Sequence, residues 1–189
     1  MQPIYLTSFV GLAGTVTTLL GVLVANRTQL KNQRLNNQVQ IELAREKTNS
    51  ELTEKSRDAT NFQLANAHKI ISKINRELSL TGLNITQVAS ISIHDFNDKY
   101  MKLCENADDL MMIVDFYAPD ASEDCRALSG QMSMFWGHYQ AFLYRATSGD
   151  ITSGAAHNIE ETRKAAIKIS EKSMQAKNNI LKYMKPITN

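Results

Sequence analysis

The chain has 189 residues, which is enough for one domain and an appendage. Its 21 basic and 19 acidic side chains leave a formal net charge of +2, so the overall charge does not favour nucleic acid as a partner. The two cysteines, Cys104 and Cys125, are too few for a disulfide framework and lack CxxC spacing, which favours free thiols in a reducing compartment.

An apolar segment opens the chain. Residues 3–25 carry no charged side chain, and about 20 such residues suffice to cross the hydrocarbon core of a membrane. A secretory signal peptide is disfavoured for two reasons: no basic side chain precedes the segment, and the apolar core of a signal peptide is shorter than this segment. The sequence predicts a transmembrane helix within residues 1–26.

Basic residues follow this segment and predict its orientation. Arg27, Lys31 and Arg34 come directly after it, whereas the first acidic residue is Glu42. Because Lys and Arg next to a membrane helix stay on the cytoplasmic side, we expect a single-pass protein of the inner (plasma) membrane. Its N-terminus would lie outside and its C-terminal body in the cytoplasm, with membrane lipid as one partner. A periplasmic spacer of reversed topology is opposed by the same charges.

Small residues recur within the apolar segment. Gly11, Gly14, Thr18 and Gly21 give the spacing that lets membrane helices approach one another closely. Self-association in the membrane is one interpretation, and the general frequency of Gly and Thr in membrane helices is the other.

Residues 27–60 are rich in Asn, Gln, Glu, Lys and Arg and contain neither Gly nor Pro. Most of these residue types are good helix formers, but no heptad pattern persists. We expect a polar helical stalk or a loose coiled coil with a neighbouring chain.

Four apolar stripes at helical spacing predict four helices in the rest of the chain, residues 61–189. The first runs from Leu64 to Leu78 and is expected to end at Thr81-Gly82, before a linker over residues 83–91. Ser92 and Asp95 resemble a capping box for a second helix that ends at Pro119. Asp120 and Glu123 offer the cap of a third helix, and the last helix stops before Pro186. The prediction is an all-α chain whose body is an antiparallel four-helix bundle.

The third of these predicted helices is unusually aromatic. Trp136, Leu143 and Tyr144 lie off its apolar stripe, so they either add a second buried side or form a surface for a partner. The alternative is that this aromatic helix lines a ligand pocket between helices.

Charge is unevenly distributed in the body. Residues 94–124 hold nine acidic side chains against two basic ones, whereas residues 160–185 hold seven basic against three acidic. The two regions could face each other and select which helices pair. Alternatively, the row Lys164, Lys168 and Lys172 could contact anionic lipid headgroups or nucleic acid, of which nucleic acid is disfavoured.

No motif for catalysis, metal binding or cofactor binding is present. Glu-x-x-His, the signature of di-metal bundles, is missing, as are nucleophile motifs and Gly-rich phosphate loops. The sequence therefore predicts a non-enzymatic, membrane-anchored interaction or scaffold module that forms a homo-oligomer or binds a protein partner of unknown identity. The alternative is a membrane-disrupting effector of a toxin or phage-defence type, triggered through the soluble bundle.

Overall fold

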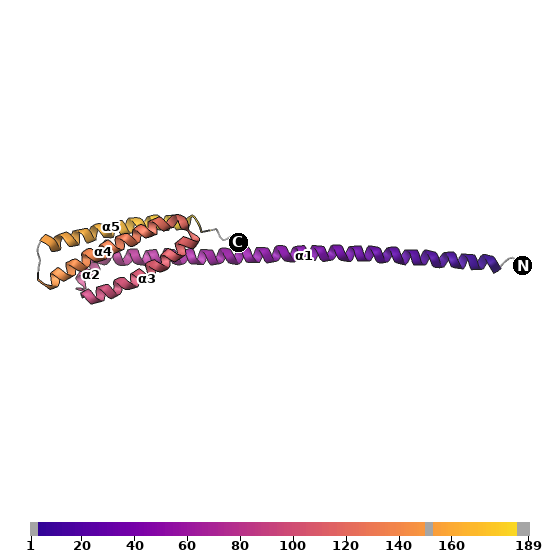
Figure 1. Ribbon diagram of the computed structural model, residues 1–189, viewed down its shortest axis with the longest axis horizontal. Helices are drawn as coiled ribbons and strands as arrows, with labels where there is room; N and C mark the ends of the chain where they lie inside the picture. Colours follow the sequence, from indigo (N-terminus) through magenta and orange to yellow (C-terminus); the bar gives the residue numbers. More distant parts are fainter. Residues whose placement is uncertain (1–3, 150–152, 185–189) are drawn as a thin grey trace. The chain divides into compact units, whose positions relative to one another are not determined.

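The chain is described by a computed structural model that covers residues 4–149 and 153–184, with side chains placed for residues 21–149 and 154–184. These residues form α1 (Ile4–Leu78), α2 (Leu80–Val88), α3 (Ile93–Tyr117), the 3₁₀ turn η1 (Pro119–Ala121), α4 (Ser122–Thr147) and α5 (Ser153–Leu181), drawn in Figure 1. No strand occurs in these ranges, and the all-α prediction is confirmed. The chain divides into two compact units, residues 1–55 and 56–189.

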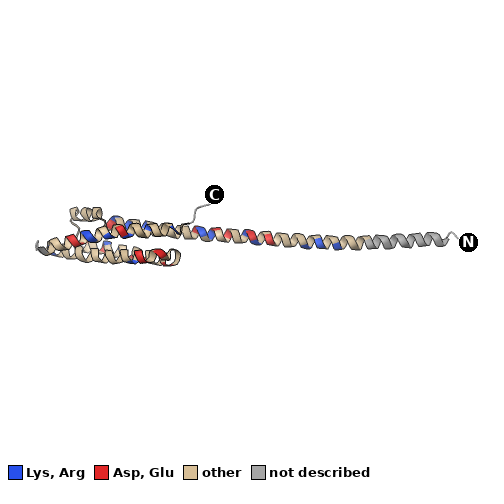
Figure 2. Ribbon diagram, turned by 90° about the horizontal axis from the view of Figure 1, so that it is seen from above, with Lys and Arg blue, Asp and Glu red and all other residues tan. Residues whose placement is uncertain are grey.

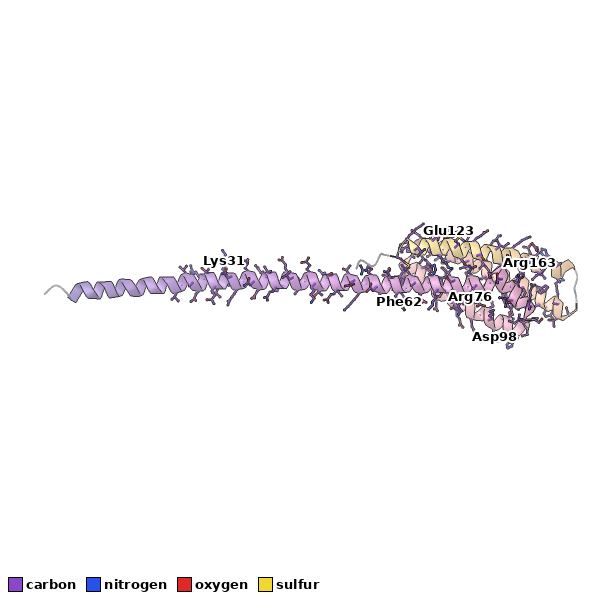
Figure 3. All side chains as sticks on the ribbon, turned by 180° about the vertical axis from the view of Figure 1, so that it is seen from behind. Lys31, Phe62, Arg76, Asp98, Glu123 and Arg163 are labelled. Atoms are coloured by element: carbon purple, nitrogen blue, oxygen red, sulfur yellow. The ribbon has the colours of Figure 1, made fainter. Side chains whose placement is uncertain are left out.

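In the first unit, the described side chains belong to residues 21–55 of α1, and all of them are exposed. Even its larger apolar side chains, such as Leu35 and Leu52, are 60% exposed. This segment therefore lacks a core of its own, and its helicity rests on backbone hydrogen bonds and favourable helix propensity. Lys31 is labelled among these outward side chains in Figure 3.

No helix in the described part of the chain is long and apolar enough to cross a membrane. The side chains of residues 1–20 lie outside the described residues, and with them most of the segment predicted to span the membrane, including Gly11, Gly14 and Thr18. Gly21 is described, and a Cβ atom added there would meet nothing within 4 Å.

The segment predicted as a linker over residues 83–91 is mostly helical, so that prediction was wrong. Helix α1 ends at Leu78, before Gly82, and the extended residue Ser79 caps α2 by accepting a hydrogen bond of 3.1 Å from Gly82 N. Gly82 therefore does not end α1 in a left-handed conformation. Its role is steric, because a Cβ there would lie 2.6 Å from the carbonyl oxygen of Arg76 and closer still to that of Glu77.

The predicted boundaries of α3 hold better than those of α4. Ser92 Oγ accepts a hydrogen bond of 3.1 Å from Asp95 N and donates one of 2.6 Å to the Asp95 carboxylate, which fixes the start of α3. The cap expected from Asp120 and Glu123 was wrong: η1 intervenes, and Ala121 precedes α4 without a side-chain cap.

Residues 56–189 form a bundle of four long helical segments, with residues 56–78 of α1 as the first (Figure 1). Polar contacts show that adjacent helices run antiparallel. Between α1 and α3, Lys73 contacts Asn106 and the later residue Glu77 contacts the earlier residue Lys99. Between α3 and α4, Asn97 contacts Trp136 and the later residue Asp115 contacts the earlier residue Arg126.

Helix α5 closes the ring by contacting both α4 and α1. Lys172 of α5 pairs with Asp124 of α4, and Ser170 of α5 donates to Asn75 of α1. The order around the bundle is therefore α1, α3, α4, α5, and α3 lies diagonally across from α5. The apolar stripes meet inside, where the largest fully buried side chains are Tyr139, Phe135, Leu64, Ile71, Ile74, Leu83, Leu110, Leu128, Met132, Ile169, Ile180 and Val114.

Candidate interaction surfaces

The tryptophan predicted for a partner surface is held between α3 and α4. Trp136 stacks on Tyr100 with 5.5 Å between ring centroids, and its Nε1 donates a hydrogen bond of 2.9 Å to Asn97 Oδ1. Phe96 of α3 meets Tyr139 of α4 edge to face at 4.8 Å. These contacts give Trp136 a packing role within the bundle, on a second side of α4.

Leu143 and Tyr144 are placed differently from Trp136. Tyr144 is 71% exposed, whereas Leu143 is half-buried and lines a cleft of about 310 Å³ between α2 and α4. The other lining residues of this cleft are uncharged: Thr86, Gln87, Ser90, Ile91, Tyr139, Phe142, Ala146 and Thr147. Burial raises the pKa of the Tyr139 hydroxyl, so it stays protonated near neutral pH.

The predicted lysine row is divided between different partners. Lys164 lies 2.7 Å from Glu161 on its own helix, which raises the pKa of Lys164 and lowers that of Glu161. Lys172 reaches across to Asp124 of α4 at 3.3 Å. Lys168, between them, is exposed. The three lysines therefore do not form one uninterrupted cationic surface.

Cys125 lies in the core of the bundle, and its surroundings determine the protonation of its thiol. Burial, the largest cause, and the charges of Asp124 and Asp115 raise the pKa of the Cys125 thiol to about 12, so it is not a thiolate near neutral pH. His138 and His157 face each other across α4 and α5 with 6.4 Å between ring centroids. In the described part of the chain, no three His, Cys, Asp or Glu side chains are placed to hold a metal ion.

Charge separates into two layers of the bundle. The layer of α3, η1 and α4 carries nine acidic and four basic side chains, whereas residues 56–78 of α1 together with α5 carry nine basic and five acidic ones. Figure 2 colours both kinds of charge, and Figure 3 labels Asp98 on α3 and Arg163 on α5 at opposite edges of the bundle. The predicted facing of the acidic and basic regions holds for Asp124 with Lys172, but the acidic side chains of α3 lie on the diagonal helix.

Two exposed apolar stripes were not predicted from the sequence. On α3, Met101, Met112 and Phe116 are 59%, 57% and 79% exposed. On α5, Ile167, Met174 and Leu181 are 47%, 66% and 51% exposed. Both sets are spaced so that they fall on one side of a helix, but each lies off the stripe that forms the core. A second apolar periodicity in each helix was the signal available in the sequence.

Comparisons with protein-family models, with curated proteins and with solved structures found no match to this chain.

Proposed function

We propose that this chain is a single-pass, membrane-anchored helical module that acts by binding copies of itself or a protein partner rather than by catalysis. Its uncharged segment over residues 3–25 supports the anchor, and the basic residues Arg27, Lys31 and Arg34 support a cytoplasmic bundle. The exposed helical residues that follow would carry the bundle away from the membrane surface.

The observation that carries the interaction role is the exposure of large apolar side chains on the outside of a bundle whose core is already complete. Phe116 and Met112 are more than half exposed on α3, although Ile113 and Val114 between them are buried. Met112 and Phe116 are four residues apart and so lie next to each other on one side of α3, and covering their apolar surface with a partner would gain about 25 cal/mol per Å².

The anchor can be tested with the full chain carrying a reporter after Asn189. We expect activity from a cytoplasm-only reporter and retention of the protein in washed membranes. Leu12→Arg should release much of it, because an arginine at the centre of a membrane helix costs about 2.5–3.5 kcal/mol. Activity from a periplasm-only reporter, or equal release of wild type and variant, would contradict the anchor.

Association is tested on the same protein extracted in mild detergent. Light scattering that separates the protein mass from the detergent mass should show more than one copy of the chain per particle. Otherwise, a second protein should co-purify at fixed stoichiometry. A single copy at all concentrations, without any companion, would contradict the interaction role.

The alternative role is a membrane-disrupting effector, favoured by the small residues Gly11, Gly14 and Gly21 in the apolar segment. Expression of the chain would then collapse the membrane potential, measured with a voltage-sensitive dye, and Gly14→Leu would prevent the collapse. Under the interaction role, both proteins leave the potential unchanged.

A further inference from the structure

The cleft between α2 and α4 has no charged side chain in its lining. Its volume of about 310 Å³ lies at the lower end of the range for small-molecule pockets, about 300–1,000 Å³. A single water needs only about 10–15 Å³ of such space. Because a buried charge without a counter-charge is costly, the lining suits an uncharged molecule larger than water.

Tyr139 is the one fully buried residue of this lining, with 0% of its surface exposed. Three aromatic rings surround its own ring. Phe96 meets it edge to face at 4.8 Å, Phe142 stacks on it at 5.8 Å, and Phe135 lies 6.0 Å away between ring centroids. These contacts fix the position of the phenol, so its hydroxyl is in place before a ligand enters.

The hydroxyl of Tyr139 has no hydrogen-bond partner among the described residues. Buried tyrosine hydroxyls usually have one, because leaving the group unpaired away from water is costly. Burial raises the pKa of this hydroxyl, so it keeps its proton near neutral pH and can donate. An acceptor atom on a molecule in the cleft would supply the missing partner.

Two further polar side chains of the lining are available to a ligand. The Gln87 amide and the Ser90 hydroxyl make no hydrogen bond within the described part of the chain. Thr86 and Thr147, by contrast, donate at 2.8 Å to carbonyl oxygens of their own helices. The cleft thus combines apolar and aromatic walls with a few unengaged polar groups, which is the usual composition of a small-molecule site.

Helix α2 forms one wall of this cleft and has few buried contacts. Leu83 is its only buried side chain. Ser90, just beyond its end, has a φ of 49°, in the left-handed region that residues with a Cβ rarely adopt. Because an element with few buried contacts opens at low cost in free energy, this wall can move away from α4 to admit a ligand.

We propose that the cleft between α2 and α4 binds an uncharged small molecule that has an apolar body and a hydrogen-bond acceptor. The body packs against Phe142 and Leu143, and the acceptor takes the hydrogen bond of the Tyr139 hydroxyl. This site goes beyond the proposed function, because it requires neither self-association nor a protein partner. Its failure would leave the proposed function standing.

Two probes that differ in one group test the proposal on the full chain in mild detergent. The ketone para-fluoroacetophenone has a carbonyl acceptor, and para-fluorotoluene has none. Fluorine NMR should show saturable binding of the ketone to the wild type, beyond its partition into empty micelles. Tyr139→Phe should raise the Kd of the ketone about three- to tenfold, because it removes the donor alone. It should not raise the Kd of para-fluorotoluene.

The matched control is Tyr144→Phe, which makes the same chemical change at an exposed side chain outside the cleft and should bind both probes as the wild type does. Ala146→Phe fills the cleft from an exposed position and should abolish saturable binding of both. Far-UV circular dichroism should show equal helicity for all four proteins.

Three results would overturn the proposal. The first is a wild type without saturable binding of the ketone. The second is equal binding of the ketone by the wild type and Ala146→Phe, which would place the bound probe outside the cleft. The third is a Tyr139→Phe variant that weakens both probes equally, because the tyrosine would then act by packing and not through its hydroxyl.

Discussion

Trp136 of α4 donates a hydrogen bond of 2.9 Å from Nε1 to Asn97 Oδ1 of α3, while the same indole stacks on Tyr100. The only tryptophan of the chain thus joins two helices through a polar contact and an aromatic one. Asn97 is also approached by Gln140 Nε2 at 3.5 Å, a distance too long to replace the indole donor fully.

Trp136→Phe should lower the free energy of unfolding by about 1–3 kcal/mol, because it removes the donor to Asn97 and leaves a gap beside Tyr100. The measurement is urea denaturation followed by far-UV circular dichroism. Tyr144→Phe is the control, since Tyr144 is 71% exposed and should change stability by less than about 0.5 kcal/mol. Equal midpoints for both variants would refute the packing role of Trp136.

Gly82→Ala should destabilise the bundle by about 1–3 kcal/mol, because the new Cβ would collide with carbonyl oxygens at the end of α1. Gly137→Ala is the matched control within α4, where a Cβ meets nothing within 4 Å. Relief of backbone entropy should make the control about 0.5–1 kcal/mol more stable. Tryptophan fluorescence during denaturation reports both changes, and the same sign for the two variants would contradict the steric role of Gly82.

Cys125 should resist iodoacetamide in the folded protein at pH 8, because its pKa is raised from 9.0 to about 12 and the thiol is buried. Mass spectrometry should find it labelled only after denaturant is added. Since the folded state holds this proton more tightly than the unfolded one, its contribution to stability is complete below pH 9 and disappears as the pH rises towards 12. Rapid labelling of native protein at pH 8 would contradict this placement.

Removing the Asp124 side chain should lower stability more than removing either Lys172 or Lys164 of the predicted lysine row. Its carboxylate accepts from Asn179 Nδ2 at 2.8 Å and from Lys172 Nζ at 3.3 Å, joining α4 to α5. Asp124→Ala should cost about 1–2 kcal/mol by removing both contacts. Lys164→Ala should cost about 0–1 kcal/mol, because Lys164 is exposed, and Lys172→Ala should cost less than Asp124→Ala, because Asp124 keeps its hydrogen bond from Asn179. Thermal melts of the three variants measure their loss of stability. A larger loss for Lys164→Ala than for Asp124→Ala would contradict the prediction.

Much of the fold could be predicted from the sequence because hydrophobic periodicity reports which side of a helix is buried. The stripe from Phe96 to Val114 and the stripe from Cys125 to Tyr139 are buried as expected, and Pro119 separates their helices. Helix α2 was missed because its nine residues are too few to display a period. Gly82 resembled a helix terminator for a different reason: the close approach of backbone carbonyl oxygens that requires a glycine there leaves no pattern in the sequence.

The candidate surfaces could be predicted less well than the fold. Trp136 and Tyr144 were grouped by their position off the core stripe, but Trp136 packs against α3 and Tyr144 faces solvent. The exposed Met112 and Phe116 were not predicted as a surface: with Met101 they recur on one side of the helix, but apolar residues outside the core stripe are also common on ordinary protein surfaces.

By itself, the sequence determined that the described chain is helical and which side of each long helix is buried, since both follow from local propensity and periodicity. Only the tertiary structure decided the order of helices around the bundle. That order places α3 diagonally from α5, so charges of α3 pair with α1 and α4, as Lys99 does with Glu77 and Asp115 with Arg126, or face outward, instead of meeting those of α5. The reason is physical: an apolar stripe specifies burial against some neighbour, and the choice of neighbour depends on packing and connections that involve the whole bundle.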